Sequence, residues 1–336
     1  MRIVVVTDAW HPQTNGVVRT LETVGAELTA LGHDVHYLTP EHFSSIPCPT
    51  YPEIPLCYNV RRRLTRSIDA LRPCAIHIAT EGPLGLAARA YCRRQKLPFS
   101  SAYHTRFPEY LAARFRIPPR WTYALLRWFH NAAARTMVAT PSLRQELERR
   151  GFKHLSLWTR GVDLQLFRPG DKSSLTLPRP IHLYVGRVAV EKNIEAFLRL
   201  PLPGSKLVVG GGPQLDQLKA RYPAAHFLGA KYGEELAGYY RACDVLVFPS
   251  RTDTFGLVLL EALASGLPVA AYPVTGPKDV LDGLPARGLD EDLGRAVRQA
   301  LDVPPAACRA HAERYSWRAS AEQFICNLQP IGRALT

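Results

Sequence analysis

An acidic pair, Asp253 and Glu261, frames the stretch DTFGLVLLE and is the first feature with clear chemical potential. A continuous apolar run at 244–248 precedes it and predicts a strand buried on both faces. Apolar spacing over 255–265 predicts a helix that ends before Gly266. The first N–H groups of such a helix attract an anion, and a glutamate buried inside it needs a partner such as a ligand hydroxyl. The stretch favours an anionic, hydroxyl-bearing ligand. The alternative is an ordinary strand–helix unit whose N-terminal acid favours the helix dipole.

A basic pair occupies a comparable position earlier in the same half. Residues 182–186 (HLYVG) predict a buried strand, and Arg187 and Lys192 follow it in the loop RVAVEKN. A guanidinium fork and a compact ammonium group at this spacing can clamp a diphosphate. The alternative is a solvated loop that carries two cations. The glycine turn at 210–212 we interpret only as a chain reversal.

The N-terminal half begins with the same alternation of strand and helix. After a first apolar strand, a loop at 8–16 ends in the turn-forming pair Asn15-Gly16, and residues 17–31 predict an amphipathic helix. Ligands of such sheets bind at the carboxyl ends of the strands, and a later strand delivers His104 to one of these ends. No G-x-G-x-x-G fingerprint is present. A plain turn glycine at 16 and a packed histidine at 104 are the alternatives.

These stretches together resemble glycosyltransferase family 4, whose members are retaining enzymes of the GT-B fold. DTFGLVLLE is similar to the acid-x7-acid signature of the family, with Asp253 in place of the usual first glutamate. The resemblance implies that Glu261 binds the ribose hydroxyls of a nucleotide. It also implies that Asp253, which is shorter by one methylene, meets a hydroxyl of the donor sugar. VGRVAVEKN is a second match, which implies that Arg187 and Lys192 bind the donor diphosphate.

Two further matches lie in the N-terminal half. HPQTNGVVRTL carries Gly16 where the family uses a glycine backbone to admit the diphosphate, and YHTRFPEY carries His104 where a family histidine lies near the reacting sugar. Both stretches resemble a subgroup that contains bacterial lipid glycosyltransferases (sulfolipid and glycosyl-diacylglycerol synthases) and α-mannosyltransferases. The catalytic residues implied are His104, Asp253, Arg187 and Lys192. The donor-binding residues implied are Asn15, Gly16, Gly186, Arg187, Lys192, Asp253, Thr254, Phe255, Gly256, Leu257 and Glu261.

The length of the chain fits this family. A chain of 336 residues suits two domains. The resemblance implies an α/β protein of the GT-B fold, with two Rossmann-like domains facing a central cleft. We expect an N-terminal acceptor-binding domain at 1–165, a nucleotide-sugar-binding domain at 171–313, and a C-terminal helix within 314–336 that returns to the first domain. The Pro-rich residues 41–60 predict a surface loop.

The positive charge is concentrated in one segment. The net charge of the chain is +13, and residues 61–150 hold 18 Lys and Arg against five acids. This predicts a polyanionic partner, either nucleic acid or an anionic bilayer, and a compositional bias toward arginine is the alternative. Within this segment, residues 107–135 predict a helical face that can lie in a bilayer interface or pack in the core. That face holds Trp121, Leu125, Trp128, Phe129 and Ala132, with Arg120, Arg127 and Arg135 around it.

The remaining composition indicates a cellular location. No run of 18 apolar residues exists, and MRIVVVTDAW predicts a strand rather than a signal peptide. The seven cysteines are scattered without a C-x-x-C pattern, which favours reduced thiols. We expect a cytoplasmic protein that associates peripherally with the inner face of the membrane.

The predicted reaction is transfer of a hexosyl group, with retention, from a nucleoside-diphosphate sugar to a membrane lipid such as diacylglycerol. A UDP-sugar is favoured and GDP-mannose is possible. Arg187, Lys192 and the helix N-terminus before Gly256 would stabilise the leaving diphosphate. No His/Cys cluster is present, so we expect neither a metal nor a cofactor.

Four alternatives remain at this point. The acceptor can be a soluble sugar or small molecule, as for some α-mannosyltransferases. A phosphorylase of the same architecture would need a lysine for pyridoxal phosphate, which no feature supports. A non-catalytic pseudoenzyme is disfavoured by the intact basic and acidic pairs. A basic nucleic-acid-binding protein, which we do not expect, would bind with a steep salt dependence and turn over no nucleotide sugar.

Overall fold

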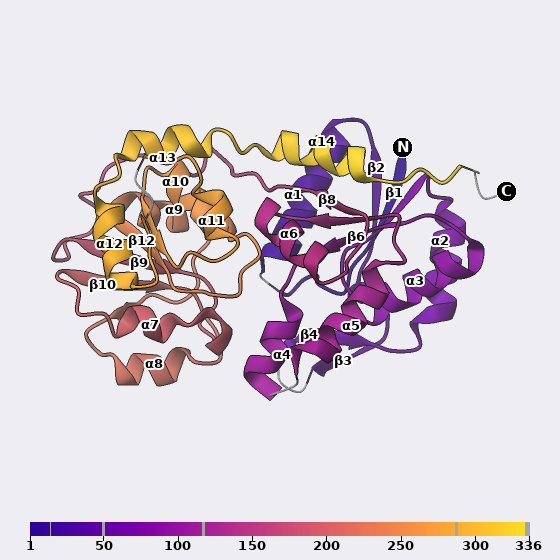
Figure 1. Cartoon of the computed structure of the whole chain (residues 1–336), viewed down its shortest axis with the longest axis horizontal. Helices are drawn as coiled ribbons and strands as arrows, with labels where there is room; N and C mark the ends of the chain where they lie inside the picture. Colours follow the sequence, from indigo (N-terminus) through magenta and orange to yellow (C-terminus); the bar gives the residue numbers. More distant parts are fainter. Residues whose placement is uncertain (14, 49–50, 116–117, 286–287, 333–336) are drawn as a thin grey trace. The chain divides into compact units, whose positions relative to one another are not determined.

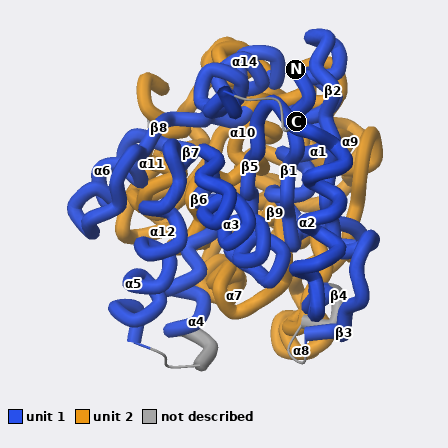
Figure 2. The backbone as a smooth tube through the Cα atoms, turned by 90° about the vertical axis from the view of Figure 1, so that its right-hand side faces the viewer, with its two compact units in different colours: residues 1–112, 116–160, 317–336 blue, residues 113–115, 161–316 orange. Residues whose placement is uncertain are grey.

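The chain folds into two compact units, which Figure 2 colours separately. The computed structural model describes residues 1–13, 15–48, 51–115, 118–285 and 288–332. Unit 1 consists of Met1–Ala112, Arg116–Arg160 and Trp317–Thr336, and unit 2 consists of Ala113–Phe115 and Gly161–Ser316.

A six-stranded parallel sheet forms the centre of unit 1 (Figure 1). Its strand order is β2-β1-β5-β6-β7-β8. The apolar run Ile3–Val6 forms most of β1 and is buried, as a central parallel strand requires. The strands are β1 (Arg2–Val6), β2 (Asp34–Leu38), β5 (Ala75–Ile78), β6 (Ser100–Tyr103), β7 (Arg135–Val138) and β8 (Leu155–Leu157).

Helices pack on this sheet, and their first residues end the loops that leave the strands. α1 begins at Gly16 because the Asn15 side chain accepts hydrogen bonds from the N–H groups of Val17 and Val18. α14, from the end of the chain, packs against α1 in unit 1 (Figure 1). The helices are α1 (Gly16–Ala30), α2 (Val60–Leu71), α3 (Pro83–Gln95), α4 (Phe107–Phe115), α5 (Pro119–His130), α6 (Pro141–Arg149) and α14 (Trp317–Asn327).

A β-hairpin occupies the segment expected to be a loop. After a short 3-10 helix, η1 (Pro40–His42), strands β3 (Ser45–Cys48) and β4 (Tyr51–Cys57) pair antiparallel. The prediction of a loop over 41–60 is therefore wrong. Pro47 and Pro55 stand opposite each other in the register. Because this sheet has two strands, each strand keeps one outer edge, and an edge tolerates a residue that cannot donate a hydrogen bond.

The aromatic stretch at 107–135 also differs from its prediction. It forms two helices, α4 and α5, and Pro119 starts the second of them. Trp121, Leu125 and Trp128 form an exposed row on α5, whereas Phe129 is buried. Assigning Phe129 to the same face was wrong, because it belongs with the stripe of α5 that packs into unit 1. That buried stripe consists of Tyr123, Leu126 and Phe129. Ala132 lies beyond the end of α5 and is half-buried.

Unit 2 contains a second six-stranded parallel sheet, of order β11-β10-β9-β12-β13-β14. The chain runs outward from β9 in one direction and then returns to β12 on the other side of β9, so the topological switch point lies between these two strands. The strands are β9 (Ile181–Val185), β10 (Ser205–Val209), β11 (His226–Phe227), β12 (Val245–Phe248), β13 (Val269–Ala271) and β14 (Gly288–Leu289). The helices are η2 (Val190–Lys192), α7 (Ile194–Leu198), α8 (Leu215–Arg221), α9 (Gly233–Ala242), α10 (Leu257–Ala264), α11 (Pro277–Val280), α12 (Leu293–Leu301) and α13 (Pro305–Ala312).

Candidate active site

The loops that leave β9 and β12 meet at the switch point of unit 2. Lys192, at the end of η2, places Nζ 2.5 Å from Oδ1 of Asp253, in the loop after β12. Two further hydrogen bonds join the loops: Asn193 Nδ2 donates to the Pro249 carbonyl at 3.1 Å, and Thr252 Oγ1 donates to the Glu191 carbonyl at 3.1 Å. The fold thus brings one member of the basic pair and one member of the acidic pair into contact.

Arg187 stands on a loop that is supported by the glycine turn after β10. The N–H of Val188 donates to the Gly211 carbonyl at 2.8 Å, and Tyr184 Oη donates to the Arg187 carbonyl at 2.7 Å. A Cβ at Gly210, whose φ is +146°, would lie 1.8 Å from the Gly186 carbonyl oxygen. The turn is therefore more than the chain reversal that the sequence indicated, since its lack of side chains lets the Arg187 loop lie directly on it.

The start of α10 is the second part of this site. Gly256, with φ of +88°, stands immediately before Leu257, the first helical residue, and it has no side chain to cap the helix. The first N–H groups of α10 thus have no capping side chain at this position, as suits a helix terminus that receives an anion. Thr254 and the buried Phe255 complete the loop between Asp253 and the helix.

Glu261 lies in the second turn of α10 and is only 3% exposed. The hydroxyl of Tyr240, on α9, donates to its Oε2 at 2.7 Å. A buried carboxylate needs such donors, and Tyr240 supplies one from within the protein. Sequence reasoning missed Tyr240. The sequence does contain a signal for it, a tyrosine on the apolar face of a predicted helix. A tyrosine hydroxyl that is buried usually needs a hydrogen-bond partner, so such a residue is a candidate partner for a buried carboxylate.

The predicted residues of the first half all lie in unit 1. Asn15 and Gly16 form the start of α1, and His104 follows the end of β6. His104 Nδ1 receives a hydrogen bond at 3.2 Å from Arg160, and the His104 ring stands edge-on to the Trp158 indole. Burial, followed by the charge of Arg160, lowers the pKa of His104 well below its ordinary value. His104 is therefore a neutral imidazole near neutral pH.

The switch point of unit 1, between β1 and β5, is filled by the protein itself. Asp8 follows β1, and its carboxylate accepts hydrogen bonds from the N–H groups of Leu84 and Gly85 at the start of α3 and from Thr80 Oγ1. Burial raises the pKa of Asp8 despite these bonds. A Cβ at Gly82 would lie 2.5 Å from the Asp8 Cγ, so the carboxyl group occupies this terminus closely. In this respect α3 differs from α10 of unit 2.

Among the described residues, no three His, Cys, Asp or Glu side chains are grouped so that they could hold a metal ion. Independence from metal stays a prediction.

The two units each contain a six-stranded parallel sheet, and unit 2 has the strand order of a nucleotide-binding fold with cationic and acidic side chains at its switch point. This is the architecture of the GT-B fold, which the comparisons with known proteins confirm. The family described as Glycosyltransferase Family 4 matches residues 14–166, and the family described as Glycosyl transferases group 1 matches residues 179–302. The chain belongs to glycosyltransferase family 4, as the sequence motifs indicated.

Similar proteins include members of the expected subgroup. A sulfoquinovosyl transferase of Arabidopsis thaliana is 30% identical, over 91% of this chain and 68% of its own length. A GDP-mannose-dependent alpha-mannosyltransferase of Mycobacterium tuberculosis is 31% identical, over 84% and 81% respectively. An alpha-monoglucosyldiacylglycerol synthase of Streptococcus pneumoniae is 27% identical, over 96% and 83%.

Solved structures share the fold over nearly the whole chain. Sucrose-phosphate synthase from Thermosynechococcus elongatus superposes with a TM-score of 0.73 at 23% identity, covering 97% of both chains. Anabaena HepE in complex with UDP-glucose gives a TM-score of 0.71 at 14% identity, covering 97% of this chain and 98% of its own. At these identities the likeness concerns the GT-B fold alone.

Proposed function

We propose that this glycosyltransferase moves a hexosyl group, with retention and without a metal, from a UDP-sugar to a membrane lipid such as diacylglycerol. The observation that carries the transfer chemistry is the grouping of Lys192, Asp253 and the uncapped start of α10 at the switch point of unit 2. Arg187 and Lys192 would neutralise the diphosphate as it leaves, and the helix terminus would add N–H donors. Glu261 would bind the ribose hydroxyls beside Tyr240.

The choice of a lipid acceptor is supported by the exposed row on α5. Trp121, Leu125 and Trp128 are 65%, 56% and 53% exposed, and they recur at helical spacing along one side of the helix. The guanidinium of Arg89 stacks on Trp128, 3.6 Å from the ring centroid, and donates to the Trp128 carbonyl. Large apolar side chains beside cations are the composition of a helix that lies in a bilayer interface.

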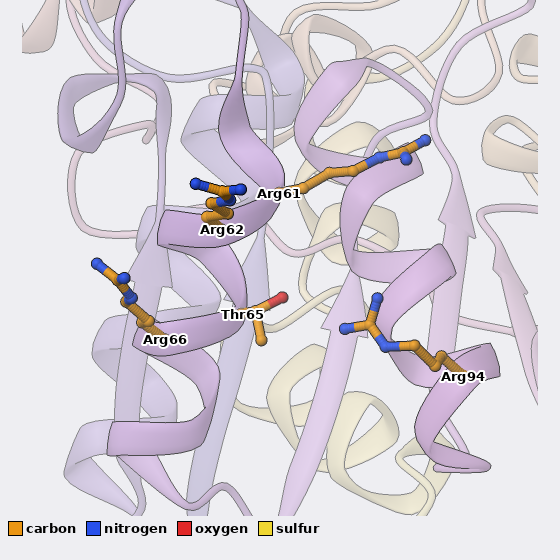
Figure 3. Close-up of a pocket in the computed structure, with 5 residues that line it drawn as sticks. All are labelled: Arg61, Arg62, Thr65, Arg66 and Arg94. Carbon is orange, nitrogen blue, oxygen red and sulfur yellow. The ribbon is translucent and has the colours of Figure 1, made fainter.

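A basic depression on helices α2 and α3 is a second feature that favours contact with an anionic membrane (Figure 3). Arg89 of α3 donates to the Trp128 and Phe129 carbonyls of α5, and α3 packs on α2. The helix α3 therefore links the basic depression to the aromatic row within unit 1. Each arginine near an anionic leaflet contributes about 1 kcal/mol to binding. The depression holds about 300 Å³ and is lined by Arg61, Arg62, Thr65 and Arg66 of α2 and by Arg94 of α3.

The activities of the relatives also support the proposal. A sulfoquinovosyl transferase and a glucosyldiacylglycerol synthase are among them, and HepE was solved with UDP-glucose. A second candidate is transfer from GDP-mannose to a soluble acceptor, which the mycobacterial relative favours. Among the described residues, every helix is too short or too polar to span a bilayer. The exposed row on α5 and the basic depression lead us to propose peripheral binding.

The deciding experiment is a panel of UDP-glucose, UDP-galactose, UDP-glucuronate, UDP-sulfoquinovose and GDP-mannose, each with diacylglycerol vesicles and with soluble sugars. Nucleotide release and product mass are measured, and NMR of the product gives the anomeric configuration. We expect an α-linked glycolipid from one UDP-sugar. A product formed only from GDP-mannose and a soluble sugar would establish the second candidate, and a β-linked product would contradict retention.

Vesicle flotation tests the membrane surface independently of turnover. Replacing Trp121, Leu125 and Trp128 together by serine should reduce flotation with anionic vesicles, as should replacing Arg61, Arg62, Arg66 and Arg94 by glutamine. Leu301→Ser removes an exposed apolar side chain from α12 of unit 2 and is the matched control. Equal flotation of all these variants would contradict the proposed surface.

A further inference from the structure

Arg160 is a buried cation that touches the predicted catalytic histidine. Its side chain lies just after β8 in unit 1, and the residue is 5% exposed. Nη1 donates to the carbonyls of Trp158 at 2.6 Å and of Thr159 at 3.2 Å, and Nη2 donates to His104 Nδ1 at 3.2 Å. The guanidinium also lies over the Trp158 ring, 4.2 Å from its centroid. Four contacts therefore fix the orientation of this group.

The environment of Arg160 is unusual for a buried charge. Among the described residues its guanidinium contacts carbonyls, an imidazole and an indole, and it forms no ion pair with a carboxylate. Burial lowers the pKa of Arg160 to about 9, so the group stays cationic at neutral pH. A buried cation without a carboxylate costs free energy. The presence of this buried guanidinium beside His104 points to a role that a neutral side chain would not perform.

The direction of the hydrogen bond determines the form of the imidazole. A guanidinium has only N–H donors and no acceptor, so Nδ1 of His104 must accept with its lone pair. The proton of a neutral His104 then resides on Nε2. The His104 ring consequently presents an N–H donor on the side away from Arg160.

The other groups around His104 act in the same sense. His77 on β5 and His130 on α5 lie near enough to disfavour an additional positive charge, and Arg160 exceeds both in effect. The carboxylate of Glu81 lies 2.9 Å from Nε2 of His130, so it pairs with His130. Burial and the charge of Arg160 thus combine to keep His104 uncharged.

We propose that Arg160 is a positioning residue for His104: it holds the imidazole neutral and in the Nε2–H tautomer, so that His104 donates a hydrogen bond to an oxygen of the transferred sugar. This rests on the proposed function, because it takes His104 to lie at the reacting sugar. In this arrangement His104 is a donor and not a general base.

The C-terminal helix holds this assembly from behind. Trp158 Nε1 donates to Ser320 Oγ of α14 at 3.1 Å, and the Trp158 ring packs on Phe324. Gln323 of α14 accepts from the N–H of Thr159 at 2.9 Å. The backbone that carries both carbonyl partners of Arg160 is therefore fastened to α14 within unit 1.

The test uses the full chain labelled with ¹⁵N-histidine, whose ring nitrogens report tautomer and protonation by NMR. His104→Gln assigns the His104 signals and His77→Gln assigns those of its neighbour. We expect the wild-type His104 to remain in the Nε2–H form from about pH 5 to about pH 8, where an ordinary histidine would titrate. Arg160→Met keeps the volume and removes the charge and the donors, so His104 should show a mixture of the two neutral tautomers near neutral pH. Its pKa should rise, although burial continues to lower it.

Two variants separate positioning from general destabilisation. Arg160→Lys retains a cation and an N–H donor, and it should restore the wild-type His104 signals at least in part. Arg309→Met, in unit 2, removes an arginine that also donates to three carbonyls, those of Leu164, Phe167 and Ala264, and is the matched control. It should leave the His104 signals unchanged.

Turnover gives a second measurement. Arg160→Met should lower kcat/KM about tenfold or more near neutral pH, because part of His104 would then carry its proton on Nδ1 and would lose the donor toward the sugar. A wild-type His104 found in the Nδ1–H form, or titrating near pH 6.5, would overturn the proposal. An unchanged His104 spectrum in Arg160→Met would do the same. If no nucleotide sugar is turned over, the proposed function fails while the NMR result still tests the role of Arg160.

Discussion

Nζ of Lys192 and Oδ1 of Asp253 lie 2.5 Å apart, although the two residues are separated by 61 positions in the sequence. The contact joins the loop after β9 to the loop after β12 and brings the basic and acidic motifs to one point of unit 2. Both side chains are largely buried, with 22% and 15% of their surfaces exposed, so the contact is shielded from solvent. Substitutions at these two positions should therefore not act independently.

Removal of either cation should abolish most transfer. Arg187→Ala or Lys192→Ala loses a charge-assisted contact to the leaving diphosphate that contributes about 2–4 kcal/mol in the transition state, or about 30- to 1000-fold in kcat/KM. Nucleotide release under saturating acceptor measures the loss. Lys219→Ala, an exposed lysine on α8, is the control and should retain wild-type activity. Near-normal turnover in both site variants would refute the assignment of the basic pair.

A double-mutant cycle should detect the contact between Lys192 and Asp253. Asp253→Asn and Lys192→Ala each lower kcat/KM, but the double variant should lose less than the sum, by a coupling energy of about 0.5–3 kcal/mol. Asp253→Glu keeps the charge and supplies the acid usual in the family signature, so it should stay within about threefold of wild type, a change of well under one kcal/mol. Strict additivity would mean that the two residues act separately during turnover.

The glycine turn offers a pair of adjacent substitutions with opposite expectations. Gly210→Ala places a methyl group against the Gly186 carbonyl and should displace the Arg187 loop, lowering kcat/KM about tenfold or more. Gly211→Ala meets nothing within 4 Å and should be close to wild type. Circular dichroism confirms that both variants are folded. Equal activity of the two would show that the turn does not support Arg187.

Acid stability should depend on His77. This histidine is buried on β5, its Nδ1 is 2.9 Å from Ser100 Oγ, and burial lowers its pKa to about 3. The unfolded chain binds a proton near pH 6.5 and the folded chain does not, so the free energy of unfolding should fall as pH drops from about 6.5 toward about 3, by up to about 1.4 kcal/mol per pH unit.

Urea denaturation at several pH values checks this dependence. His77→Gln should flatten the slope below about pH 6, whereas His226→Gln, at an exposed position in unit 2, should keep the wild-type slope. Identical slopes in all three proteins would exclude His77 as the source.

Turnover should survive a chelator. We expect full activity in EDTA because two cations and a helix terminus would stabilise the leaving diphosphate. Added Mn²⁺ serves as the comparison. Loss of activity in EDTA that Mn²⁺ restores would mean that a metal takes part.

The sequence predicted the features that depend on local pattern. The apolar runs of β1 and β12 and the spacing around Glu261 gave the correct elements, because a buried parallel strand and an amphipathic helix leave distinct periodicities. The hairpin β3–β4 was missed because its prolines resemble those of a loop, and their tolerance depends on a pairing that spacing does not encode.

The partners of the site residues were beyond local pattern. Tyr240 lies 21 positions from Glu261, and Arg160 lies 56 positions from His104. Tyr240 and Glu261 lie on different helices, α9 and α10, and His104 and Arg160 follow strands that are separated by β7 in the sheet. Each contact therefore depends on tertiary packing, which the spacing of residues in the sequence does not encode. The exposure of Trp128 and the burial of Phe129 likewise follow from how α5 docks, since adjacent residues on a helix differ by about 100° in direction.

Asp8 has a consequence for anion binding at the start of α3. At the switch point of unit 1 the protein supplies its own carboxyl group to the N-terminus of α3, bonded to Leu84 and Gly85. A phosphate arriving there would have to displace a group that is covalently attached and always present at high local concentration. One side chain thus acts as a resident competitor. At the start of α10, Gly256 has no side chain that could compete in this way.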